Sequence, residues 1–181
     1  MIAIDSENVE TIESFLLEYA DRSTPNTVES ASLWYRDGED LCHDLARIGD
    51  TTLEVAAAVV GALSARERWS SNVSKAYAFF YGRPIRGLSN NLHTANMATV
   101  LGFDALNGQK TNAFARALAG DDEAIVIDVW MMRAAGYTKD SPNKTDYAEI
   151  SEAIQNIAKA KGLSPRTTQA LIWILVRGSA E

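Results

Sequence analysis

The chain has 181 residues, 24 of them acidic and 17 basic, so its formal net charge is −7 and its isoelectric point is about 4.9. Apolar residues make up 46% of the sequence and charged residues 23%, which is typical of a globular protein and excludes wholesale disorder. The longest apolar runs fall short of the ~18 residues that a membrane span needs, and Cys42 is the only cysteine, which excludes an internal disulfide and a cysteine-held metal cluster.

The start of the chain is acidic where a secretory signal would be basic, so a cytoplasmic protein is expected. The charge is unevenly distributed. Residues 1–50 hold 12 acidic and three basic side chains, whereas residues 66–116 hold seven basic and two acidic ones. An acidic protein as a whole is a poor partner for nucleic acid, but this basic stretch is suited to contact phosphates. We expect an acidic helical region over 1–50 that packs on a helical core over 51–181.

Helical periodicity dominates the first region. Apolar residues recur at three- and four-residue steps from Val9 to Tyr19, which predicts an amphipathic helix. A second helix is expected after Pro25, interrupted at Asp37-Gly38 and closed by Gly49-Asp50.

The second region also reads as helical throughout. Residues 53–63 are nearly uncharged and rich in Ala and Val, which predicts a buried helix capped by Thr51 or Thr52. Gly162 is expected to stop a helix, and Ser164-Pro165 to start the last one. Helices are expected over 66–81, 92–100, 111–119, 145–161 and 165–177.

The segment Ala124-Ile125-Val126-Ile127 is the one stretch with strand character. An isolated strand is not stable, and no comparable partner is apparent in the sequence. We therefore expect a buried lead-in to a helix that begins at Asp128, and the predicted fold class is all-α.

The dipeptide Asn107-Gly108 predicts a tight turn between two short helical stretches. A glycine allows the backbone to approach a ligand closely, and the free N–H groups of the helix start that follows favour an anion such as a DNA phosphate. Lys110 is placed to contact phosphate or to act as a nucleophile, although a surface lysine is the simpler interpretation.

Asp128 follows an apolar segment and precedes Val129-Trp130. A carboxylate at the edge of an apolar wall can act as a base or as an electrostatic stabiliser, and it can equally be a helix cap. The two histidines, His43 and His93, are isolated, so neither a metal nor another cofactor is expected.

Three stretches in order resemble the helix–hairpin–helix DNA glycosylases of the endonuclease III superfamily. The resemblance covers about residue 50 to the C-terminus, with the hairpin at 105–119 and the catalytic-Asp segment at 124–135. Lys110 and Asp128 stand 18 residues apart, the interval of the bifunctional members. The matching stretches are Ala62-Leu63-Ser64-Ala65 with the later Asn72 and Lys75-Ala76, Lys110-Thr111 with Ile127-Asp128, and Leu171-Ile172-Trp173-Ile174 with Arg177-Gly178.

The resemblance implies a two-lobed helical fold that binds double-stranded DNA and rotates a damaged or modified base out of the duplex. It implies Asp128 as the catalytic carboxylate, Lys110 as a lyase nucleophile and Arg66 as the plug of the vacated base stack. Trp69 and Trp130 are candidates to stack on the extruded base, and Trp173 is assigned to the core. DNA contacts are expected from Asn107, Gly108, Gln109, Thr111, Arg66, Arg68, Lys75 and Arg116.

The sequence also departs from this family. The hairpin is two residues shorter, Trp130 replaces a histidine, Arg66 replaces a glutamine, and the iron–sulfur cysteines are absent. Two alternatives therefore stay open. One is an enzyme of the same fold that hypermodifies bases in bacteriophage DNA. The other is a non-catalytic module that binds DNA or protein, with residues 1–50 available to a protein partner.

Overall fold

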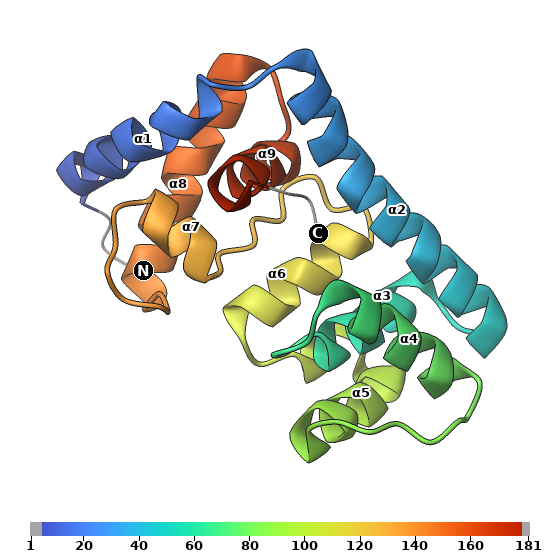
Figure 1. Cartoon of the computed structure of the whole chain (residues 1–181). Coiled ribbons are helices and arrows are strands. Elements are labelled where there is room, and N and C mark those ends of the chain that lie inside the picture. Colours follow the sequence, from blue (N-terminus) through green and yellow to red (C-terminus); the bar gives the residue numbers. More distant parts are fainter. Residues whose placement is uncertain (1–4, 179–181) are drawn as a thin grey trace. The chain divides into compact units, whose positions relative to one another are not determined.

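The computed structural model describes residues 5–178 as helices joined by short connections (Figure 1). These described residues contain no β-strand, which confirms the all-α prediction. In chain order the elements are α1 (Ser6–Ala20), α2 (Pro25–Gly49), α3 (Leu53–Leu63), α4 (Trp69–Phe80), α5 (Ser89–Leu101), the 3₁₀ turn η1 (Gly102–Ala105), α6 (Gln109–Leu118), α7 (Val129–Ala134), α8 (Lys144–Lys161) and α9 (Pro165–Arg177).

The helices group into two compact units. Of the described residues, the terminal unit contains 5–34 and 122–178, and the central unit contains Tyr35–Asp121. Helix α1 packs against α8 and α9, so it belongs with the C-terminal helices. The division falls inside α2 and at Asp121, and it therefore differs from the boundary at residue 50 that the charge pattern suggests.

The core of the terminal unit is built by α1, α8 and α9. Ile150, Ile154 and Ile157 form one fully buried face of α8 at helical spacing. They belong to one apolar cluster with Leu16 of α1 and Ile172 of α9. The short helix α7 packs on α9, and this contact positions the segment that carries Asp128.

Helix α3 is the central helix of the central unit. Residues 56–63 are all buried, because α4, α5 and α6 each pack against the helix. At Gly61 a Cβ would lie 2.9 Å from the Cβ of Ala115, so the glycine permits α6 to approach closely. The predicted buried helix over 53–63 is confirmed, and Thr52 is its cap, accepting from the backbone N–H of Val55.

Helix α2 is continuous, so the expected interruption at Asp37-Gly38 is wrong. A glycine in a helix interior costs only about 1 kcal/mol, which tertiary packing overrides. At Gly38 a Cβ would lie 2.5 Å from Cδ2 of Leu118, so the small residue serves packing against α6. On the same helix, burial and the neighbouring charge of Glu39 raise the pKa of the Cys42 thiol to about 12, which leaves it unreactive at neutral pH.

The other helix starts follow the sequence with small shifts. Asn143 and Asp146 form a capping box at α8, and Ser164 with Pro165 starts α9 as predicted. Helix α5 begins three residues before the expected position, and α4 begins three residues after it. Every helix of the described chain is too short or too polar to cross a bilayer.

Candidate functional site

A buried segment leads directly to Asp128. Its four residues, Ala124 to Ile127, are buried without forming a strand, and Asp128 is the N-cap of α7, as the sequence predicts. The hydroxyl of Tyr147 donates to the carbonyl of Ile125 at 2.6 Å and holds the segment in place. Burial raises the pKa of Tyr147 to about 12, so this hydroxyl keeps its proton in the physiological range.

Asp128 is half-buried, and both of its carboxylate oxygens accept hydrogen bonds. Oδ1 accepts from the backbone N–H groups of Trp130 at 2.9 Å and Met131 at 3.0 Å, which is the helix cap. Oδ2 accepts from the indole Nε1–H of Trp173 on α9 at 3.0 Å. The cap alone uses one oxygen, so the bond from Trp173 adds a fixed orientation of the whole carboxylate.

The indole of Trp173 is held from two further sides. Its ring makes a tilted contact with Trp34 at 6.0 Å between centroids, and the guanidinium of Arg177 lies 4.6 Å from its centroid. A second pair of this kind joins Arg133 to the ring of Trp130 at 5.1 Å. The role of Trp173 could not be predicted from local sequence, because its contact with Asp128 joins residues 45 positions apart. Its only sequence signal is that Trp173 lies within the third matching stretch.

In the central unit, Leu106–Gly108 form a short connection between η1 and α6, so Asn107-Gly108 does lie between two short helical stretches. Gly108 is the N-cap of α6, and no side chain caps this helix. The first turn carries Lys110 and no acidic residue. Gln109 and Lys110 are exposed, and Thr111 is half-buried. Uncapped N–H groups beside a lysine make this helix start favourable for an anion.

The turn itself does not require Gly108. Its φ of −89° is accessible to any residue, and a Cβ would meet Oγ1 of Thr111 at 3.5 Å, an ordinary contact. The connection is therefore not a tight turn that depends on the conformational freedom of glycine, as the sequence suggested. The absence of a side chain at residue 108 leaves the exposed hairpin backbone accessible, and this is the property that a bound phosphate needs.

Arg66 lies in a strained turn between α3 and α4. It is exposed and has a φ of +63°, a left-handed conformation that costs a non-glycine residue about 1 kcal/mol or more. Both neighbours are tied down. Asn91 donates to the carbonyl of Ala65 at 3.0 Å, and Lys75 forms an ion pair with Glu67. This turn explains why α4 begins at Trp69 rather than at residue 66.

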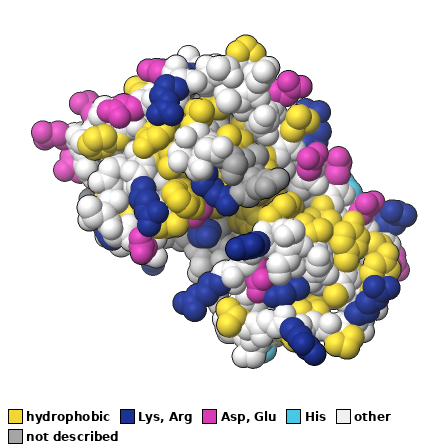
Figure 2. All heavy atoms as spheres, viewed as in Figure 1, with side chains coloured by type: hydrophobic (Ala, Val, Ile, Leu, Met, Phe, Trp, Pro, Cys, Tyr) yellow, Lys and Arg dark blue, Asp and Glu magenta, His cyan; other side chains and the backbone are white. Residues whose placement is uncertain are grey.

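The remaining basic candidates differ in how exposed their side chains are and in whether they already have a partner. Arg68 is exposed beside the start of α4. Lys75 is half-buried, and its ion pair, with a bond from Ser71, lowers the pKa of Glu67. Arg116 is exposed, stacks over Phe103 at 4.8 Å and donates to Asn112 at 2.8 Å. In Figure 2 several dark-blue Lys and Arg side chains lie in the region of α4 and α6, and magenta acidic ones over α1.

The two aromatic candidates also differ. Trp69 belongs to the central unit, where its ring packs edge-on against Phe114 at 6.2 Å and adjoins the apolar core. Trp130 belongs to the terminal unit with Asp128. The basic residues, the hairpin and Trp69 all lie in the central unit, so joint action of Lys110 and Asp128 stays a prediction. Within residues 5–178, no three potential metal ligands of the His, Cys, Asp or Glu type come together.

Fold and sites together define an all-helical protein with an oriented carboxylate in one unit and, in the other, an uncapped helix start beside Lys110. The family model described as "Family of unknown function (DUF7178)" matches residues 1–180, and the chain belongs to this family. Searches of curated proteins and of solved structures gave no match. The description of this family names no activity.

We predict that Arg66→Gly leaves the fold intact and raises the free energy of unfolding by about 0.5–1 kcal/mol, because glycine adopts a positive φ without the steric penalty. Asp50→Gly is the matched control, since Asp50 is the other described non-glycine residue with a positive φ, at 47°. Urea denaturation measures both. A loss of stability in Arg66→Gly alone would show that the arginine side chain is a structural requirement rather than a strained functional group.

Proposed function

We propose that the protein binds double-stranded DNA and acts on a damaged or modified base rotated out of the duplex, as a glycosylase-like enzyme of the helix–hairpin–helix type. The observation that carries this proposal is the hydrogen bond from Trp173 to Oδ2 of Asp128. A cap is complete when one oxygen meets the helix N–H groups, as Oδ1 does here. An indole donor from a different helix gives the second oxygen a fixed position that capping alone does not explain.

A fixed carboxylate suits the chemistry of base excision. Departure of the base leaves positive charge on the sugar, and a negative group already held in place stabilises that charge without reorganising. Asp128 is half-buried beside apolar Met131 and Met132, so its charge is only partly screened by water. In this role Asp128 stabilises the sugar cation or activates the attacking nucleophile.

The central unit supplies the DNA-binding part of the proposal. The uncapped start of α6, the bare backbone at Gly108 and the exposed Lys110 together suit a backbone phosphate, which requires no reading of sequence. Arg66 is exposed and held in a strained turn, as expected of a side chain that must project into the gap left by an extruded base. Two compact helical units agree with the two-lobed fold that the resemblance implies.

A lyase branch follows if Lys110 reaches the sugar. Its neutral amine would attack C1′ as the bond from C1′ to the base breaks. Cleavage of the C1′–O4′ bond, with the amine proton passed to O4′, would then open the sugar ring and give the imine that permits strand cleavage. The alternative reaction, hypermodification of bases in phage DNA, would use the same carboxylate and the same DNA surface on a different substrate.

The non-catalytic alternative is favoured by one observation. Oδ1 caps α7 and Oδ2 accepts from Trp173 of α9, so the same three bonds also serve a purely structural connection between these two helices.

We predict that Asp128→Asn lowers base release by about 100-fold or more while DNA binding persists, because the amide keeps the cap but removes the charge. The amide also faces the N–H of Trp173, so a stability loss of about 1 kcal/mol is expected. Release is measured by chromatography on duplexes that carry a panel of damaged and hypermodified bases.

Asp5→Asn is the matched control for this substitution, since Asp5 caps α1 in the same terminal unit by accepting from Glu7. It should leave base release unchanged. Full base release by folded Asp128→Asn, or no release from any duplex by the native protein, would remove the catalytic proposal and leave the binding module.

For the hairpin surface, we predict that Gly108→Ala and Lys110→Ala both weaken duplex binding. Lys110→Ala should leave the thermal stability unchanged, whereas Gly108→Ala should cost up to about 1 kcal/mol, because alanine is a poorer N-cap than glycine. Loss of one phosphate contact by Lys110→Ala should make the negative slope of log affinity against log salt shallower by about 0.9. Fluorescence anisotropy at several salt concentrations measures both effects. Borohydride trapping of a covalent DNA adduct, abolished in Lys110→Ala, would establish the lyase branch.

Lys159→Ala is the control for charge, because Lys159 is exposed at the end of α8 in the terminal unit. It should change neither affinity nor salt slope beyond the effect of net charge. Binding that is independent of salt, or equally weakened by Lys159→Ala and Lys110→Ala, would contradict a phosphate site at the start of α6.

A further inference from the structure

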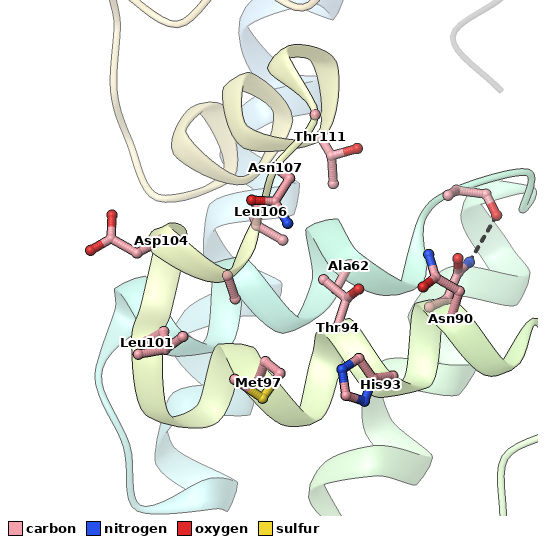
Figure 3. A pocket seen from close by; sticks show the side chains of 14 residues that line it. Ala62, Asn90, His93, Thr94, Met97, Leu101, Asp104, Leu106, Asn107 and Thr111 are labelled. Carbon is pink, nitrogen blue, oxygen red and sulfur yellow. Dashed lines mark hydrogen bonds between the residues drawn. The ribbon is translucent and has the colours of Figure 1, made fainter.

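A pocket of about 530 Å³ opens within the central unit, between the end of α3, one side of α5 and the hairpin (Figure 3). In Figure 3, Thr94 of α5 points toward Ala62 of α3, while Asn107 and Thr111 face the pocket from the hairpin and the start of α6. Ligand pockets for small organic molecules have volumes of roughly 300–1,000 Å³, so a single heterocycle fits with room to spare.

The lining has a specific chemical character. Three carboxamides, from Asn90, Asn91 and Asn107, are accompanied by the hydroxyl groups of Thr94 and Thr111. Among the described residues that line the pocket, Asp104 carries the one carboxylate and His93 the one imidazole, and none is a lysine or an arginine. Amides and hydroxyl groups each offer donors and acceptors, so the lining suits a neutral group that also carries both.

The floor and rim of the pocket are apolar. Ala62 and Leu106 are buried, whereas Met97 and Leu101 remain 42% and 45% exposed on α5. The exposed methionine and leucine provide an apolar surface for van der Waals contact, and the neighbouring carboxamides provide hydrogen-bond donors and acceptors. A nucleobase has these two surfaces, an apolar face and an edge of alternating donors and acceptors.

One wall of the pocket is already ordered. Asn91 is only 8% exposed, and its Nδ2 donates to the carbonyl of Ala65 at 3.0 Å. This bond fixes the orientation of the carboxamide before a ligand arrives. Ala65 also lines the pocket and directly precedes Arg66. The bond from Asn91 to Ala65 therefore connects the pocket wall to the strained turn.

We propose that this pocket binds one unpaired nucleobase, supplied either by a free nucleotide or by a nucleotide in DNA. Gly108 and Thr111 line the pocket and also belong to the proposed phosphate surface at the start of α6. A base in the pocket is therefore adjacent to the place where its own backbone phosphate would bind. In the DNA form the inference rests on the proposed function, because opening of the duplex is what supplies an unpaired base.

The test titrates the ¹⁵N-labelled full chain with a 2′-deoxynucleoside 5′-monophosphate, and separately with deoxyribose 5-phosphate, which lacks the base. Base-specific shifts are expected in amide resonances along α5 and at Asn107–Thr111. Asn90→Leu should weaken nucleotide binding about fivefold through lost hydrogen bonding. The matched control is Asn96→Leu, an exposed carboxamide on the same helix that does not line the pocket and should bind as the native chain does.

The two sources of the base are separated with DNA. A duplex with a single-nucleotide bulge should shift the same resonances, and a fully paired duplex should shift only those at the start of α6. Equal shifts with the base-free sugar phosphate, shifts away from the pocket, or equal weakening by Asn90→Leu and Asn96→Leu would overturn the proposal. If the bulged duplex shifts the pocket resonances and the free nucleotide does not, the free nucleotide is ruled out as the source of the base and DNA remains.

This experiment is distinct from the test of catalysis. Nucleotide binding by the Asp128→Asn chain, with no base release by the native protein, would support the pocket and remove the enzyme. Base release without any nucleotide shift in the pocket would support the enzyme and remove this inference.

Discussion

The hydrogen bond between the indole of Trp173 and the carboxylate of Asp128 is the interaction on which the account of the terminal unit depends. It joins the start of α7 to the middle of α9, and it completes an arrangement in which both oxygens of Asp128 are fixed. The rest of the unit supports it. Tyr147 holds the buried segment before Asp128, and the isoleucine face of α8 anchors the helices around it. A solvent-exposed aspartate would be hydrated by water and would not need these bonds to fix its orientation.

In the central unit the corresponding constraint is the close packing of small residues. Gly38 and Gly61 lie where a Cβ would meet a side chain of α6. This packing presents the start of α6 and its preceding turn as a fixed, exposed surface. Three helices of this unit, α4, α5 and α6, begin without a side-chain cap, whereas α1, α7, α8 and α9 of the terminal unit are all capped by side chains. Uncapped N–H groups cost little where water or a ligand can meet them.

Local patterns predicted most of the fold. The all-α class, the buried α3, the lead-in to Asp128 and the caps at Thr52 and Ser164 depend on spacing and residue type within a few positions. The errors arose from tertiary contacts. Gly38 interrupts a helix by propensity, yet Leu118 fills the space beside it, and the turn at Arg66 is held by Asn91 from 26 residues away. The bond from Trp173 to Asp128 and the pocket beside the hairpin could not be predicted from local patterns either, since each joins segments that are distant in sequence.

The central claim is that Asp128 presents a fixed negative charge to a cationic sugar, and one binding measurement tests it without knowledge of the base. Affinity is compared for two duplexes that differ at one abasic position, a neutral tetrahydrofuran in one and a cationic pyrrolidine in the other. The account predicts that the native chain binds the pyrrolidine duplex about tenfold or more tightly than its neutral counterpart, because a mimic of the transition state gains most from the carboxylate. Asp128→Asn should lose this preference and Asp5→Asn should keep it. Equal affinity of the native chain for the two duplexes would contradict the claim.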